Sequence, residues 1–294
     1  MPAGNPTTKK RLLGREIAYM IDKTGISQTQ AAKILETSQS RIAGLLNGTG
    51  TITPGDLTLL ATGLGFTDPD YLEVLRELRR DYHKRGFWNT GHRRAYSEDI
   101  RLRIDLEQHA DKFSALEVEI VFGLFQCESY VRALHADEPN INDVSLEDMI
   151  QARLARQQIL DTSNPPSMHV VLSESCLRRV WGGPEVMREQ IDHLIKLSNR
   201  PNIFLQVMPF DQPAGRRSPI GCPFVVLRVP TPGRAGPLEM AYVEGQGEIR
   251  YVDDEDSVRV YEDAWARLSN AALRYDETRS FLTEVDREFA NRSA

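Results

Sequence analysis

The stretch GISQTQAAKILETSQSRIAGLLNG, from Gly25 to Gly48, has the spacing of two short helices joined by a tight turn. Ser27 and Ser38 stand where each helix would begin, and a serine hydroxyl accepts a hydrogen bond from an amide that the first helical turn leaves free. Ala32 is small enough for two helices to touch there. The residues expected in their joint core are Ile34, Leu35, Ile42 and Leu45. The stretch therefore predicts a helix-turn-helix, whose second helix enters the major groove of DNA.

With those residues buried, the second helix keeps a polar face for DNA, formed by Gln39, Ser40, Arg41 and Gly44. Gln39 can bond an adenine edge through both ends of its amide, and Arg41 can bond guanine or a phosphate. Ser40 is short and permits close approach. Further residues are expected to contact the DNA backbone, which positions a protein without reading sequence: Lys33, Asn47, Thr49 and Thr51. For Lys33 and Arg41, the alternative is an ordinary solvated helix face.

The same helical periodicity continues on both sides of this stretch. It predicts a helix at Lys9–Lys23, a helix that begins at Thr53 and ends near Gly63, and a helix at Asp70–Lys84. Pro54 suits a first helical turn, where its missing amide hydrogen is not needed. Residues 1–84 therefore predict an all-α domain of five helices, and residues 85–97 are expected to link it to a second domain.

From residue 98 to residue 294 the pattern alternates long helices with short strands, which predicts a larger α+β domain. Helices are expected at 98–111, 128–134, 145–160, 184–198, 257–273 and 278–289. Strands are expected at 114–119, 169–172, 203–208, 224–229, 240–244 and 249–252.

Charge also separates the two parts of the chain. Residues 1–94 carry 14 Lys and Arg against 9 Asp and Glu, whereas the remainder carries 22 against 33. A basic part on an acidic body favours a polyanion such as double-stranded DNA as the partner of the first part. One module of this kind buries only about 600–1,000 Å² on DNA. We therefore expect a homodimer on a palindromic operator.

The helix-turn-helix stretch resembles that of the XRE family, the lambda-repressor/Cro-like regulators, over about Arg11–Phe66. In that family the position of Gln28 meets a phosphate, and the resemblance implies the same contact here, at a helix N-terminus that favours an anion. Glu36 occupies the turn position where the family usually has glycine. A positive φ at such a residue costs about 1 kcal/mol. Either the turn differs slightly or this cost is tolerated.

Three strings in the larger domain carry a second resemblance: GLFQCESYVRAL at Gly123–Leu134, ARLARQQIL at Ala152–Leu160 and GGPEVMREQIDHLIKLSNRPNIFLQVMPF at Gly182–Phe210. They are similar to the C-terminal domain of actinobacterial XRE-type regulators, described as Scr-family and toxin-antitoxin antitoxin-like. That family tends to have Pro-Gly-Leu-Leu-Gln-Thr where this chain has Phe122–Cys127. The resemblance implies a regulator of development or antibiotic production, often encoded beside a small partner protein.

Residues that invite other chemistry lie in the larger domain. His169, Ser173, Ser175 and His193 are residue types of a hydrolase, but neither serine lies in a G-x-S-x-G elbow. The run Asp253–Asp256 suits either Mg²⁺ or the start of a helix, where carboxylates are favoured. We therefore expect a protein that is not an enzyme and has no cofactor or metal.

Two further features have open interpretations. Trp181, followed by Gly182 and Gly183, indicates a turn anchored by a buried ring rather than a ligand platform. The loop Pro209–Gly221 carries Arg216 and Arg217, which can contact DNA, an acidic partner or nothing.

The three cysteines lack the spacing of a zinc site, and no apolar run reaches about 18 residues. The first thirty residues carry charges where the apolar part of a signal peptide would lie. These features predict a reduced, cytoplasmic protein without a membrane span.

Three functions fit the sequence. The first is a sequence-specific transcriptional regulator whose larger domain serves dimerisation and binds a small partner protein or ligand. The second is an antitoxin-like protein that sequesters a small neighbouring toxin-like protein, with DNA binding for autoregulation. The third is a ligand-sensing repressor, which predicts an apolar pocket with a few polar groups in the larger domain.

Overall fold

The computed structural model describes residues 7–81, 98–136, 145–211, 221–245 and 248–293. By compactness the chain divides into two units. The described residues of the first unit are 7–81, 98–109 and 229–238, and those of the second are 110–136, 145–211, 221–228, 239–245 and 248–293. The segment that joins two strands of the sheet, residues 229–238, thus belongs to the helical unit.

The first unit contains the five helices expected from the sequence and a sixth, at residues 98–109, that was expected at the start of the larger domain. Its helices are α1 (Thr8–Thr24), α2 (Gln28–Ile34), α3 (Gln39–Leu46), α4 (Pro54–Gly63), α5 (Pro69–Asp81) and α6 (Glu98–His109). The side chains of Ser27, Ser38 and Thr53 cap α2, α3 and α4, each accepting from an amide in the first helical turn. The expected end of the fifth helix at Lys84 and the linker 85–97 lie outside the described residues.

Fully buried apolar side chains from four helices form the core of this unit, among them Leu12, Ile17, Met20, Ile42, Leu57, Leu60 and Leu75. Helices α1 and α3 approach closely at Gly14, where an added Cβ would lie 2.5 Å from the carbonyl oxygen of Leu46. A side chain at this position would push the two helices apart. The glycine in α1 therefore sets how closely α3 packs on α1.

The segment 229–238, which we call the clasp, is fixed to α1 by a buried carboxylate. Glu16 is fully buried. The hydroxyl of Tyr71 donates to it at 2.8 Å and that of Thr231 at 3.1 Å. The backbone amides of Arg234 and Ala235 donate to it at 2.9 Å and 3.2 Å. Because a buried carboxylate is costly unless its oxygens accept hydrogen bonds, these four donors make the burial of Glu16 possible.

Two arginines complete the contact between the clasp and the helices. The guanidinium of Arg234 lies 4.5 Å from the centre of the Tyr71 ring and forms an ion pair with Asp68. Arg15, the neighbour of Glu16 in α1, donates to the carbonyl oxygen of Pro237 at 2.9 Å. Burial and the hydrogen bond to Glu16 raise the pKa of the Tyr71 hydroxyl, so that it stays protonated as a donor.

The second unit is built on a six-stranded sheet. Its strands are β1 (Lys112–Glu117), β2 (Ser167–Ser173), β3 (Ile203–Met208), β4 (Phe224–Val229), β5 (Leu238–Glu244) and β6 (Ile249–Val252). They lie in the order β3-β2-β1-β4-β5-β6. β1, β2 and β3 pair in parallel, whereas β4 is antiparallel to β1 and β6 is antiparallel to β5. The parallel strands need long crossovers, and the helices between them supply these.

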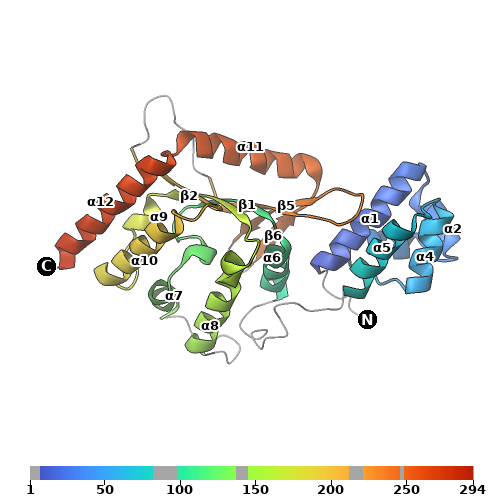
Figure 1. Cartoon of the computed structure of the whole chain (residues 1–294), viewed down its shortest axis with the longest axis horizontal. Coiled ribbons are helices and arrows are strands. Elements are labelled where there is room, and N and C mark those ends of the chain that lie inside the picture. The colour runs from blue at the N-terminus through green and yellow to red at the C-terminus, as the bar shows by residue number, and fades with distance from the viewer. Residues whose placement is uncertain (1–6, 82–97, 137–144, 212–220, 246–247, 294) are drawn as a thin grey trace. The chain divides into compact units, whose positions relative to one another are not determined.

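Helices cover both faces of the sheet (Figure 1). They are α7 (Glu128–His135), α8 (Leu146–Gln157), α9 (Ser175–Arg178), α10 (Pro184–Leu197), α11 (Glu255–Ala271) and α12 (Tyr275–Ser293). α11 lies on one side, where its buried residues meet a cluster that includes Leu116, Val171 and Val226. α7, α8 and α10 lie on the other side, and α12 packs against α10.

The expected α+β class of this part is confirmed, although its helices differ in detail from the expected set. The short helix α9 was not expected. The helix expected at 145–160 is α8 followed by a 3-10 helix at Gln158–Asp161. None of the described helices combines the length and the apolar composition that a membrane span requires.

Gly233 tests the clasp, because an added Cβ would lie 2.1 Å from Glu16 Oε1. We expect Gly233→Ala to lower the free energy of unfolding by about 1–3 kcal/mol, as overpacked interiors do. The control is Gly221→Ala, where an added Cβ meets nothing within 4 Å. Urea unfolding followed by circular dichroism measures both variants. Equal midpoints would contradict the docking of the clasp on Glu16.

Candidate nucleic-acid interface

Helix α3 turns its apolar side inward and its polar start outward. Ile42 and Leu45 are buried, whereas Gln39 and Ser40 are exposed and Arg41 is half-buried. Ala32 of α2 is buried, as expected for the residue where the helices touch. The first turns of α3 therefore present hydrogen-bonding side chains to solvent.

Two residues expected in the joint core of α2 and α3 are only half-buried, namely Ile34 and Leu35. Ile34 packs instead on α4, where an added Cβ on Gly63 would lie 2.7 Å from its Cγ2. Leu35 is the C-cap of α2. The core of the motif therefore rests more on Ala31, Ala32 and the two buried residues of α3 than the sequence indicates.

The turn between α2 and α3 holds Glu36 at a φ of 48°. The amide of Glu36 donates to Lys33 O at 3.2 Å, and that of Thr37 donates to Ala32 O at 3.0 Å. This hydrogen-bond pair is the Schellman motif, which usually has glycine at the left-handed position. Of the two outcomes left open by the sequence, the turn therefore keeps its geometry and tolerates a strain of about 1–2 kcal/mol.

Gln28 and Gln39 are brought together at the starts of α2 and α3. The side-chain amide of Gln39 donates to Gln28 Oε1 at 2.7 Å. Ser38 and Ser40 share a hydrogen bond of 2.9 Å between their hydroxyls. The bond between the glutamines leaves Gln39 with its amide oxygen and one amide hydrogen free of this contact. An adenine edge in the groove needs one acceptor and one donor of this kind.

Arg41 has a partner that the sequence does not reveal. Its guanidinium lies 2.9 Å from Asp56 Oδ2 in the first turn of α4, and both side chains are partly exposed. The carboxylate holds the guanidinium beside α3 and competes with any phosphate or base that Arg41 would contact. Only the fold brings α4 beside α3, so spacing in the sequence gives no signal for this pair.

The residues that follow α3 form a tight turn. The amides of Thr49 and Gly50 and the hydroxyl of Thr49 all donate to the carbonyl oxygen of Gly44, at 3.0, 2.7 and 3.2 Å. Gly44 is half-buried, whereas Asn47, Thr51 and Lys33 are exposed. The carbonyl oxygen of Gly44 thus anchors this turn, in addition to the expected place of Gly44 on the polar face.

Two family models match the chain. Residues 100–284 match the domain of unknown function (DUF5753). The chain belongs to the DUF5753 family. Residues 17–72 match the family described as helix-turn-helix, of the XRE type, which supports a DNA-binding regulator. No curated protein and no solved structure matches the chain.

The DUF5753 part does not bring the hydrolase residue types together. Ser173 Oγ accepts from the amide of Ser175 at 3.3 Å, and Ser175 Oγ donates to Glu119 at 3.0 Å. His169 bonds Ser167 at 2.9 Å and stacks on Phe204. Burial lowers the pKa of both His169 and His193. The described serines 173 and 175 therefore have other partners than a catalytic histidine.

Two of the remaining sequence features of the DUF5753 part, the acidic run at 253–256 and the turn after Trp181, have structural explanations. Asp254 caps α11 by accepting from the amide of Ser257 at 2.9 Å, and within the described residues no group of three acidic, His or Cys side chains is placed to hold a metal ion. Gly182 and Gly183 have φ of 69° and 95°, which makes the segment after Trp181 a turn. Arg216 and Arg217 lie outside the described residues.

The pair formed by Arg41 and Asp56 makes a prediction about DNA affinity. Exposed pairs are worth about 0.2–1 kcal/mol, so Asp56→Asn should strengthen DNA binding by up to about fivefold at low salt. The gain should shrink as salt rises, because screening weakens the attraction of the released charge. Fluorescence anisotropy with labelled duplex measures the affinity. The control, Asp70→Asn, removes the same charge from α5; an equal gain there would contradict a specific role of Asp56.

Proposed function

We propose that the chain is a sequence-specific transcriptional regulator in which α3 reads base edges in the major groove. The observation that carries the proposal is the exposed start of α3, where Gln39 is hydrogen-bonded to Gln28 above a fully buried Ile42. The match to the helix-turn-helix family supports the same docking mode. Pre-positioned side chains lose less entropy when they bind DNA.

Each polar residue has a distinct role in this proposal. Gln39 reads an adenine, and Arg41 exchanges Asp56 for a guanine or a phosphate. Ser40 lets the helix approach the groove. The residues proposed to contact the DNA backbone are Gln28, Lys33, Asn47, Thr49 and Thr51, with Gly44 shaping the turn behind them.

A homodimer on a palindromic operator completes the proposal. The exposed start of α3 is short, and one module buries too little surface for tight specific binding. The DUF5753 part would supply the contacts between the two copies. Its described residues expose large apolar side chains, among them Ile120, Val180, Phe210 and Val260. The antitoxin-like alternative stays a prediction, because the matched family carries no assigned function.

The readout residues can be tested by substitution on an operator located by genome-wide mapping of bound DNA. Gln39→Ala and Arg41→Ala should each weaken operator binding by about 1–3 kcal/mol and relax the preference at one base pair of each half-site. The control Arg76→Ala removes an equal charge from the exposed face of α5. Footprints should protect two half-sites about one helical turn apart. Unchanged affinity and footprints in both variants, at matched salt, would refute the readout assignment.

A further inference from the structure

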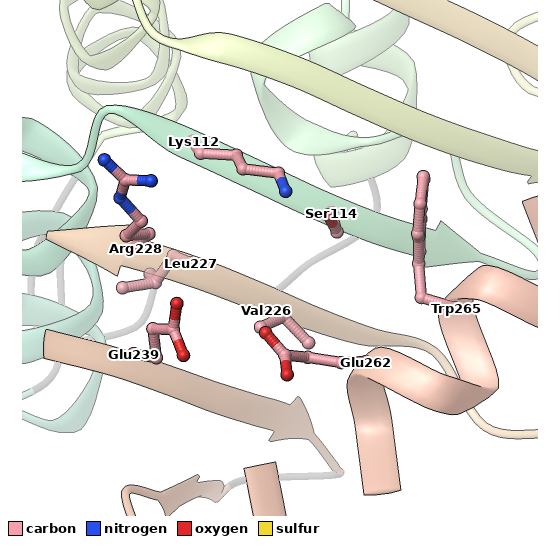
Figure 2. A pocket seen from close by; sticks show the side chains of 8 residues that line it. All are labelled: Lys112, Ser114, Val226, Leu227, Arg228, Glu239, Glu262 and Trp265. Atoms are coloured by element: carbon pink, nitrogen blue, oxygen red, sulfur yellow. The ribbon is translucent and has the colours of Figure 1, made fainter. Parts of the chain in front are cut away.

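The second unit contains a pocket of about 210 Å³ on the side of the sheet that α11 partly covers (Figure 2). It is lined by Lys112, Ser114, Val226, Leu227, Arg228, Glu239, Glu262 and Trp265. Drug-sized sites have about 300–1,000 Å³, so this pocket admits only a small molecule. Its charged lining also differs from the apolar pocket that a ligand-sensing repressor was expected to have.

The charges of the lining are of both signs and incompletely paired. Arg228 forms an ion pair with Asp111 at 3.2 Å. The side chains of Lys112, Glu239 and Glu262 form no ion pair within the described part of the chain. Figure 2 shows Lys112 and the two glutamates on opposite sides of β4. A molecule with a negative and a positive end would satisfy both sides at once.

Two further observations favour such a molecule. The buried indole nitrogen of Trp265 has no hydrogen-bond partner among the described residues, which leaves a donor for a carboxylate oxygen. Burial and the nearby charge of Glu239 raise the pKa of Glu262. An ammonium group between the two glutamates would remove this repulsion.

The position of the pocket in the chain connects it to the clasp. Arg228 and Glu239, which line the pocket, are the residues directly before and after the clasp at 229–238. The clasp in turn holds α1 and Tyr71 of α5 through Glu16. A ligand that moves Arg228 or Glu239 would therefore displace one end of the segment that holds the helix-turn-helix unit.

We propose that this pocket binds a small zwitterion of amino-acid size, with its carboxylate at Lys112 and its ammonium at Glu239 and Glu262, and that the bound molecule controls DNA binding through the clasp. The binding step stands independently of the function proposed above. The control step rests on that function.

Calorimetric titration of the full chain tests the binding step. The probes are the common free L-amino acids, tested one at a time, with acetate and methylamine as probes of one charge only. At least one amino acid should bind, and acetate and methylamine should bind at least tenfold more weakly.

Lys112→Ala and Glu262→Gln should each weaken amino-acid binding at least tenfold. The controls Lys196→Ala and Glu284→Gln, on α10 and α12, should leave it unchanged. The proposed ligand class is overturned if no amino acid binds at millimolar concentration, or if the pocket variants bind as the wild type does.

DNA affinity with and without the bound amino acid tests the control step. For the wild type, saturation with the amino acid should change operator affinity at least threefold. Arg234→Ala removes the ion pair to Asp68 and the contact with Tyr71, so it should keep amino-acid binding and lose this change. The control Arg274→Ala, an exposed residue of the second unit, should keep both. Equal affinities in the presence and absence of the amino acid would overturn control through the clasp. Failure to bind any duplex would refute the proposed function and leave the binding result standing.

Discussion

The buried carboxylate of Glu16 requires hydrogen-bond donors from two distant parts of the chain, and both parts therefore belong to the helical unit. A charge removed from water is tolerated only where donors replace the lost hydration. Tyr71 supplies one donor from the helical domain itself, whereas Thr231, Arg234 and Ala235 supply three from a segment more than two hundred residues away. Without that segment, the carboxylate would lose most of its partners. The packing of the helix-turn-helix unit is therefore complete only when the clasp, residues 229–238, docks on α1.

Much of the fold could be predicted because its elements have local causes. Ser27, Ser38 and Thr53 mark helix starts through chemistry that involves only the next three residues. The sheet strands are short apolar runs between turn residues, and six of them were expected near their observed positions. Gly14 and Gly233 carry no such signal, since their importance depends on what lies opposite them after folding. The clasp could not be found from the sequence for the same reason.

The candidate site also has one part that local sequence predicts and another part that depends on how the helices pack. The outward face of α3 follows from helical periodicity, which places Ile42 and Leu45 on one side and Gln39 on the other. The contacts that Gln39 and Arg41 make with Gln28 and Asp56 depend on helix packing and are not encoded by spacing. The turn at Glu36 could be predicted only in part. The sequence indicates a strained residue there, and only coordinates show that the positive φ is kept.

The strain at Glu36 and the hydrogen bonds to buried Glu16 have opposite effects on the stability of the same small unit. A residue held at positive φ lowers stability, and a small domain has little stability to lose. Hydrogen bonds to a buried charge are among the stronger ones in proteins, and the clasp contributes three of them. The stability of the helical unit therefore depends on the clasp, a segment that the chain supplies between β4 and β5.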